Sequence, residues 1–481
     1  MTSTAALAAV LVLAGCGSSY PGSGWPLPNG DLAGTRAVDA GLDSTNVPHL
    51  HVLWRFPLRS KPTFSGLVAA TPVVAGERVY VQDLDSNVFA LDRDTGRPVW
   101  RHLFRSQSGG PNGVAVALGR IYGNTATAAF ALDATTGKLV WKRRLTTPKQ
   151  PITIAPAVAQ GVVVTSTTGA SPGGRGEVVA LDAGDGHVLW RFDTVAEPWP
   201  HPKLANGGGA WQTPTVDSSG HVWVGTANPN PWGGSKAFPN GGMYPGPVRW
   251  TDSLLELDLH TGALVWGEQV TPHDVRDYDF QDPPVLTGSL VVGAGKGGNV
   301  IAWNRSTHER VWTAPVGVHR NDTGPLPAKQ VSVCPGLLGG VETPLAVADG
   351  RVFAPVVDLC FPESALGTSL AGFLTADYAS GRGELAALDL KTGRRLWTRQ
   401  LDSPDFGCAT VSRDVVFTAT YAGAVLALRA STGEVLWRAN ARAAINACPA
   451  VAGKLLIVAA GAAYTKPRTE QDEVVAYAPP S

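Results

Sequence analysis

Charged residues are scarce in this chain. They make up 16% of its 481 residues, and the 39 lysines and arginines equal the 39 aspartates and glutamates in number. A nucleic-acid partner is excluded, because binding phosphates needs a basic surface that displaces counterions. The sequence also has no H-E-x-x-H zinc helix, no phosphate-binding glycine loop and no Cys-x-x-Cys-His haem site. Any electrons that the protein collects must therefore leave through a separate acceptor protein.

Long hydrophobic runs are missing as well, apart from one at the N-terminus. Residues 4–14 form an apolar stretch that is too short to span a membrane and is typical of an export signal. It ends in Leu13-Ala14-Gly15-Cys16, which looks like a bacterial lipobox, so we predict a signal peptide over 1–15 and a lipid on Cys16. An ordinary signal peptide with a chance cysteine is the alternative. We expect a lipoprotein of the bacterial cell envelope, outside the cytoplasm, held to the membrane by its lipid alone.

Only four further cysteines are present, and export would place them in an oxidising compartment. Four cysteines allow three connectivities. We predict Cys334 with Cys360 and Cys408 with Cys448. The second pair is the better supported, because both residues open equivalent strands of neighbouring repeats.

Glycine and proline are abundant instead, with 56 and 37 residues, and they punctuate an internal repeat. The repeat reads A-L-D-x-x-T-G-x-x-x-W, and seven copies end at Trp100, Trp141, Trp190, Trp266, Trp312, Trp397 and Trp437. An isolated HVLW at 51–54 and an isolated VVAYA at 474–478 together complete an eighth copy. Each copy also begins with a pair of short apolar strands. The prediction is an all-β, eight-bladed β-propeller of four-stranded antiparallel blades, closed by the N-terminal strand joining the C-terminal blade. We place it at 49–481, after a tether and N-terminal segment at 16–48.

The loops of the repeat are unequal in length. Within each blade the first and third turns are short, and strand direction puts them on one face of the ring. All long insertions fall on the other face, at 101–112, 166–176, 191–212, 227–250, 267–281, 313–342 and 358–383. We therefore expect a functional cleft at the axis of this elaborated face.

Three fragments between residues 225 and 312 resemble a known family. They are GTANPNPW (225–232), LDLHTGALVWGEQVTPHDVRDYDF (257–280) and AGKGGNVIAWNRSTHERVW (294–312). They resemble the quinoprotein alcohol dehydrogenases, which bind pyrroloquinoline quinone (PQQ) and a metal ion at the axis of an eight-bladed propeller. The general repeat covers nearly the whole chain but is less specific, because non-enzymatic propellers share it.

The resemblance implies roles for five residues. Asn228 matches an amide metal ligand. Asp277 matches the catalytic aspartate, which also contacts the metal, and Asp279 matches an extra aspartate of lanthanide-dependent members. Lys296 matches a residue that contacts the quinone oxygens, and Trp211 matches the indole on which the cofactor stacks. Carboxylate and amide oxygens suit Ca²⁺ or a lanthanide ion, and an aromatic surface with a cation suits a carboxylated quinone.

Two positions depart from the family pattern. Ser171 stands where the family has a glutamate ligand, and a neutral hydroxyl is a weak partner for such an ion. The family's adjacent cysteines, which cover the other face of the quinone, are replaced by Gly109–Asn112, so we assign Asn112 to the cofactor site. A remodelled pocket follows from these departures.

The leading hypothesis is a monomeric dehydrogenase that oxidises a small or polymeric alcohol with PQQ and a metal ion. One alternative is a non-catalytic propeller lipoprotein that acts as a protein-interaction or envelope scaffold. Another is a polyol- or carbohydrate-binding module that uses Trp199, Trp232 and Trp250. Asp274 and His273 are interpreted as residues that orient the loop around Asp277.

Overall fold

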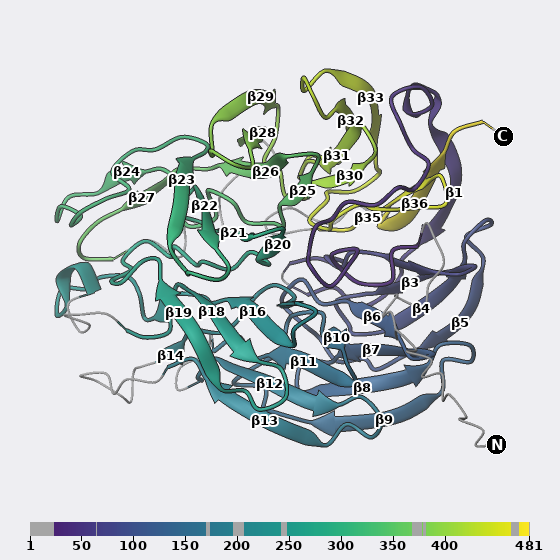
Figure 1. The fold of residues 1–481 in the computed structure, drawn as a ribbon, viewed down its shortest axis with the longest axis horizontal. Coiled ribbons are helices and arrows are strands. Elements are labelled where there is room, and N and C mark those ends of the chain that lie inside the picture. The colour runs from purple at the N-terminus through teal and green to yellow at the C-terminus, as the bar shows by residue number, and fades with distance from the viewer. Residues whose placement is uncertain are drawn as a thin grey trace, which may run out of the picture.

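The computed structural model describes residues 24–63, 65–169, 174–195, 206–241, 248–367, 378, 381–462 and 471–480. The predicted features at 1–15, Cys16, Ser171 and Trp199 lie outside these residues. Eight four-stranded antiparallel sheets are arranged in a ring, as Figure 1 shows in a view along its axis, and this confirms the predicted propeller. No helix in the described part of the chain is long and apolar enough to cross a membrane.

The blades follow one another along the chain, and each runs from an innermost to an outermost strand. Blade 1 consists of β2 (Val73–Ala75), β3 (Arg78–Gln82), β4 (Val88–Asp92) and β5 (Pro98–His102), and blade 2 consists of β6 (Val114–Ala117), β7 (Arg120–Asn124), β8 (Ala128–Asp133) and β9 (Leu139–Arg144). Blade 3 consists of β10 (Ala157–Ala159), β11 (Val162–Ser166), β12 (Glu177–Asp182) and β13 (Val188–Asp193). Blade 4 consists of β15 (Thr215–Val216), β16 (His221–Gly225), β18 (Ser253–Asp258) and β19 (Leu264–Gln269). Blade 5 consists of β20 (Val285–Thr287), β21 (Leu290–Ala294), β22 (Asn299–Asn304) and β23 (Arg310–Pro315). Blade 6 consists of β25 (Ala346–Ala348), β26 (Arg351–Asp358), β28 (Arg382–Asp389) and β29 (Arg395–Leu401). Blade 7 consists of β30 (Thr410–Ser412), β31 (Val415–Ala419), β32 (Ala424–Arg429) and β33 (Val435–Asn440).

Blade 8 joins the two ends of the chain. It contains β34 (Ala450–Ala452), β35 (Leu455–Ala460), β36 (Glu473–Ala478) and, as its outer strand, β1 (His51–Pro57). Residues of β1 pair antiparallel with β36, from His51 opposite Ala478 to Pro57 opposite Glu473. The ring is thus closed by the N-terminal strand, as the isolated repeat fragments predict.

Burial along the strands explains the composition of each blade. Second strands such as β11 are buried at every position, because neighbouring blades cover both faces of the sheet, and they are runs of β-branched residues. Outer strands such as β9 expose most side chains and carry lysine and arginine there, while keeping Trp141 buried. The main apolar clusters lie within and between adjacent blades.

The repeat tryptophans fasten each blade to the next one. At seven junctions the indole N–H donates to a backbone carbonyl of the following blade, for example from Trp54 to Arg93 at 2.8 Å and from Trp190 to Leu259 at 2.8 Å. At six junctions the ring also covers the glycine of the next blade's turn, so closely that a Cβ there would lie 2.5–2.6 Å from the indole. Because the same geometry recurs around the ring, we assign these tryptophans a structural role in holding the blades together.

The segment before β1 is packed against the ring. Residues 24–40 pass around the axis on the face of the short turns and form backbone hydrogen bonds with seven of the eight blades. Trp25 and Arg36 are fully buried there. The Arg36 guanidinium donates to the carbonyl oxygens of Ala409 at 2.8 Å and Pro449 at 2.9 Å. Of the span predicted as a tether and N-terminal segment, the part from residue 24 onward therefore seals one end of the axial channel.

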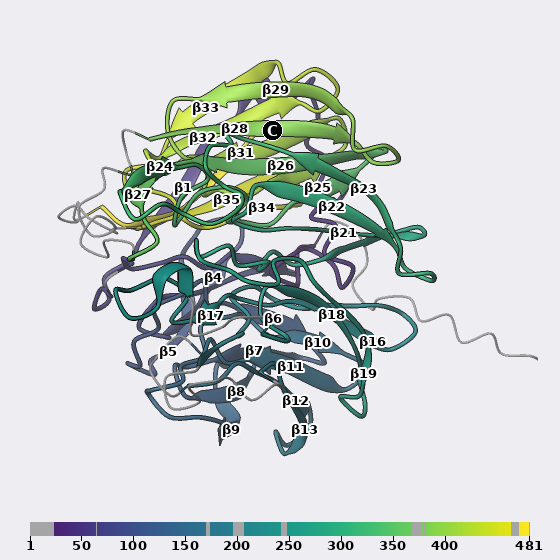
Figure 2. The same cartoon turned by 90° about the vertical axis from the view of Figure 1, so that its left-hand side faces the viewer.

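The opposite face carries the insertions. Two small two-stranded antiparallel sheets lie on it, formed by β14 (Asn206–Gly207) with β17 (Pro229–Asn230) and by β24 (Val331–Val333) with β27 (Phe361–Glu363). Figure 2 shows β24 and β27 at the left edge of the ring in side view. Two 3₁₀ turns, η1 (Val47–His49) and η2 (Pro239–Gly241), complete the described elements. Disulfides join Cys334 to Cys360 beside β24–β27 and Cys408 to Cys448 between blades 7 and 8, and both agree with the predicted pairs.

Candidate functional site

A cavity of about 320 Å³ opens at the axis on the face of the insertions. Its volume lies at the lower end of the range of about 300–1,000 Å³ that is typical of small-molecule sites. Five predicted residues line it together, although they come from four different segments of blades 4 and 5; they are Trp211, Asn228, Asp277, Asp279 and Lys296. Gly109–Pro111 of blade 1, Phe406 and Trp232 form further parts of the wall. The expectation of a cleft at the axis of the elaborated face is therefore met.

Lys296 lies at the centre of a hydrogen-bonded network in this cavity. Its Nζ lies 2.7 Å from Oδ2 of Asp277 and 2.6 Å from Oδ2 of Asp279. Asn228 binds the same two carboxylates from the other side, with its Nδ2 2.7 Å from Oδ1 of Asp277 and its backbone N 2.6 Å from Oδ1 of Asp279. All four residues are at least 91% buried. Two aspartates, one amide and one ammonium group thus form a single polar unit.

The loop between β19 and β20 is shaped to present Asp277. This residue has a φ of +66°, in the left-handed region that few residues other than glycine, asparagine and aspartate adopt. Asp274 holds the loop in this form, because its two carboxylate oxygens accept the backbone N–H groups of Arg276 and Tyr278, each at 2.7 Å. The Tyr278 hydroxyl donates to the carbonyl of Pro335 at 2.8 Å. Asp274 is therefore a positioning residue, as predicted, and the His273 side chain lies 3.0 Å from the Asn240 carbonyl oxygen through its Nε2.

A glycine allows Lys296 to approach the aspartates. The backbone N of Lys296 donates to the Asp279 carbonyl at 3.0 Å, which brings β21 and the aspartate loop into contact. A Cβ on the preceding residue, Gly295, would lie 2.2 Å from that carbonyl oxygen. Only glycine accommodates this distance, so the A-G-K sequence is required by the site itself.

Buried carboxyl groups lie both in the cavity wall and behind it, with Asp277, Asp279 and Glu342 in the wall and Asp252 and Asp274 outside it. Burial raises the pKa of Asp274 to about 6 and that of Glu342 to about 7. Burial also raises the pKa of Asp277 well above its usual range, although Lys296 opposes the shift. The same holds for Asp252, whose pKa is raised by burial and then by the neighbouring aspartates. Burial alone would lower the pKa of Lys296, but the surrounding carboxylates raise it well above its ordinary value.

This donor set fits a hard multivalent cation. Five buried carboxyl groups, those of Asp252, Asp274, Asp277, Asp279 and Glu342, surround a single lysine. Both oxygens of Asp252 and Oε1 of Glu342 have no hydrogen-bond partner among the described residues. Buried charge of one sign is costly unless it is balanced, and Ca²⁺ and lanthanide ions select carboxylate and amide oxygens. A cation here would also favour the ionised form of the aspartates.

Some predicted site residues lie elsewhere. Asn112 does not line this cavity; it lines a smaller one of about 30 Å³ toward the sealed end of the axis, where its Nδ2 donates to the Asp83 carbonyl at 2.7 Å. The preceding Gly109–Pro111 line the main cavity in its place. Of the insertion tryptophans, Trp232 faces the cavity, whereas Trp250 packs against the apolar core of blades 3 and 4.

Other wall residues were not predicted. Gln212, Gln281, Glu342 and Asn446 line the cavity. All four lie three or four residues before the innermost strands of their blades, so aligning these positions would have identified them. Asp252 has no comparable signal, because it lies at the end of an irregular insertion before β18.

Comparisons with known proteins agree with this geometry. The model of the family described as glucose/ethanol/alcohol dehydrogenase, β-propeller domain, matches residues 25–296, which is more than half of the chain. A second family model, described as outer membrane protein assembly factor BamB, matches residues 381–478. The first match ends at Lys296 and includes every predicted residue of the polar network.

Individual relatives are alcohol dehydrogenases. The chain is 29% identical to quinohemoprotein alcohol dehydrogenase of Comamonas testosteroni, over 88% of this chain and 70% of that protein. It is 26% identical to polyvinylalcohol dehydrogenase of Sphingopyxis sp. (87% and 61%) and 24% identical to lanthanide-dependent methanol dehydrogenase of Methylacidiphilum fumariolicum (86% and 80%). The crystal structure of the Comamonas enzyme superposes with a TM-score of 0.82, over 95% of this chain and 80% of the other, at 24% identity.

Proposed function

Because the chain belongs to the glucose/ethanol/alcohol dehydrogenase β-propeller family, we propose that it is a quinoprotein dehydrogenase that oxidises an alcohol with PQQ and a metal ion. The observation that carries the proposal is the convergence of Asn228, Asp277, Asp279 and Lys296 in one buried network beside Trp211. When bound, PQQ supplies the oxidant that takes two electrons from the alcohol, and the cation polarises its reactive carbonyl.

The protein side chains divide the remaining tasks. Asn228, Asp277 and Asp279 would hold the cation through oxygen atoms, with Ser171 in the place of the usual glutamate. Trp211 offers an indole face to the flat cofactor, and Lys296 offers a positive charge to its oxygens. Asp277 accepts the proton of the substrate hydroxyl, while Asp274 keeps the loop in position. The buried walls exclude water from the reacting groups.

The cellular location, the oligomeric state, the electron acceptor and the substrate class are part of the same proposal. We infer an extracytoplasmic location with a lipid anchor at Cys16, a monomeric state, and transfer of electrons to a separate acceptor protein, since the sequence has no haem motif. The substrate is a small or polymeric alcohol; similarity to a polyvinylalcohol dehydrogenase supports the polymeric class.

Reconstitution of the purified protein tests the proposal. Adding PQQ with La³⁺ or Ca²⁺ is expected to raise the Tm and to start alcohol-dependent reduction of a dye. Asp277→Asn should abolish dye reduction, whereas Asp94→Asn, in an exposed turn on the opposite face, should leave it unchanged. Absence of any Tm shift with PQQ and either metal would refute the enzyme and favour the scaffold, which the family match at 381–478 also supports.

A further inference from the structure

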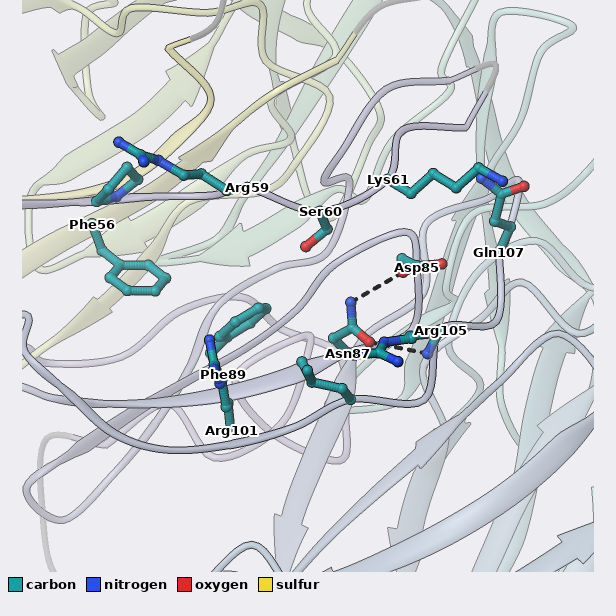
Figure 3. Close-up of a pocket in the computed structure, with 12 residues that line it drawn as sticks. Phe56, Arg59, Ser60, Lys61, Asp85, Asn87, Phe89, Arg101, Arg105 and Gln107 are labelled. Carbon is teal, nitrogen blue, oxygen red and sulfur yellow. Dashed lines mark hydrogen bonds between the residues drawn. The ribbon is translucent and has the colours of Figure 1, made fainter.

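A second, larger cavity lies where the ring closes. Its volume is about 900 Å³, and it opens between the outer part of blade 8 and blade 1, on the face of the insertions (Figure 3). One wall is the segment 56–61 at the end of β1. The other is the segment 101–107, which begins in β5, and residues 85–89 form the floor between them. We call this cavity the closure groove.

Both walls of the closure groove carry positive charge. Arg59 and Lys61 project from one wall, and Arg101 and Arg105 from the other. All four are exposed, and none of their side chains makes an ion pair or a hydrogen bond with another described residue. The only carboxylate in the lining is Asp85, which is 93% buried and receives a hydrogen bond from Nδ2 of Asn87 at 3.4 Å. Within the described part of the chain, these four cations therefore flank the groove without an ion-pair partner.

Both the floor and the walls of the groove also contain apolar side chains. Phe56 and Phe89 stand side by side with ring centroids 5.7 Å apart. Along the second wall, alternate residues line the groove, although the chain leaves the extended conformation at Arg105, where φ is +52°; they are Arg101, Leu103, Arg105 and Gln107. The Leu103 side chain is 39% exposed. A ligand that follows this wall would meet cations and an apolar side chain in turn.

We propose that the closure groove binds an extended acidic segment of a partner protein. An extended polypeptide places successive side chains on opposite sides, so carboxylates can meet the cations of both walls while an apolar side chain packs against Phe56 and Phe89. A small anion would satisfy one wall only, and a neutral ligand would leave the four cations unpaired. Exposed cations also attract an acidic partner over a distance and speed its association.

The closure groove lies beside the axial cavity, and this holds whether or not the proposed function is correct. The wall segment 101–107 continues directly into Gly109–Pro111, which line the axial cavity. Ser65 Oγ donates to the Gly109 carbonyl at 3.0 Å, and Gln107 Nε2 donates to the Pro62 carbonyl at 2.9 Å, so the two walls are joined just beside that cavity. A protein bound in the groove would sit next to the mouth of the axial cavity.

Binding of labelled polyanions to the full protein tests the proposal. Fluorescein-labelled poly-L-glutamate is the probe, labelled polygalacturonate represents an acidic polysaccharide, and fluorescence anisotropy gives the Kd of each. The variants are Arg59→Glu with Lys61→Glu, and Arg101→Glu with Arg105→Glu. Each pair should weaken poly-L-glutamate binding about tenfold or more, and added salt should weaken binding to the unaltered protein.

The matched control reverses charges on the opposite face. Lys391→Glu with Arg394→Glu changes the same number of exposed cations in a short turn of blade 6 and should leave the Kd unchanged. Circular dichroism establishes that each variant is folded. Equal loss in the control, tighter groove-dependent binding of polygalacturonate, or no binding of either polyanion would overturn the proposal. None of these outcomes depends on dye reduction, so failure here is distinguishable from failure of the proposed enzyme activity.

Discussion

The imidazole of His308 is stacked on the indole of Trp266, with ring centroids 4.7 Å apart and planes inclined by 5°. At six other blade junctions the corresponding position is a glycine. His308 adopts a φ of +61° there, and its Nε2 lies 2.8 Å from Oε2 of the buried Glu256. The junction of blades 4 and 5 thus accepts an unfavourable backbone conformation in exchange for a stack and a hydrogen bond.

The substitution His308→Gly is expected to destabilise the protein. Glycine relieves the backbone strain, but the stack is lost and Glu256 loses a partner, so the free energy of unfolding should fall by about 1–3 kcal/mol. Urea denaturation measures this change. Asn tolerates a positive φ but also lacks the imidazole ring, so it serves as the comparison, and a loss of similar size is expected for His308→Asn. A variant with glycine that is more stable than the unaltered protein would show that strain outweighs both contacts.

Gly295→Ala should disrupt the axial site. The added Cβ would lie 2.2 Å from the Asp279 carbonyl oxygen, so β21 and the aspartate loop must separate and Lys296 must move. We expect a loss of about 1–3 kcal/mol in stability and no Tm increase on addition of PQQ with La³⁺. The control is Gly288→Ala, in a turn where a Cβ meets nothing within 4 Å and only a positive φ of +54° opposes it. An unchanged response of Gly295→Ala to PQQ and La³⁺ would contradict the role given to this contact.

Much of this arrangement is visible in the sequence, and the reasons are physical. The repeat shows the blades because neighbouring blades pack in the same way around the ring, with a tryptophan over a glycine at six of the eight junctions. Asp277, Asp279 and Lys296 could be predicted because they occur in motifs with specific neighbours. The course of residues 24–40 could not, since apart from those of Arg36 most of its hydrogen bonds with the blades are made by backbone atoms and leave no side-chain pattern. Asn112 was assigned to the wrong cavity because a loop of altered length offers no register by which to place a single residue.

Arg36→Met should reveal how much the segment at residues 24–40 contributes to stability. Methionine preserves most of the volume but leaves the carbonyls of Ala409 and Pro449 without this donor, so unfolding should become easier by about 3 kcal/mol or more. Arg413→Met removes an exposed arginine that pairs with Asp39 and Asp43, and should cost less than about 1 kcal/mol. Similar losses in both variants, measured by urea denaturation, would argue against a special role for Arg36.

The pH dependence of stability should include a contribution from Asp405. This carboxyl group is fully buried against Thr418, and burial raises its pKa well above the ordinary value. The folded protein therefore keeps a proton that the unfolded chain releases above about pH 4, and stability falls as the pH rises toward the higher, folded pKa. Asp405→Asn should reduce this fall by up to about 1.4 kcal/mol per pH unit. Urea denaturation at about pH 5 and about pH 8 makes the comparison, and an unaltered slope would contradict the assignment.

Closure of the ring by β1 and β36 also has a consequence for synthesis of the chain. Seven blades have all their strands before the last one can be finished, because its inner strands are made at the end and its outer strand at the beginning. Until then the growing protein exposes unpaired strand edges on both sides of a gap, and such edges pair readily with other chains. The newly made protein is therefore most prone to aggregate just before its final residues are added, and a chaperone that shields these edges would help most at that moment.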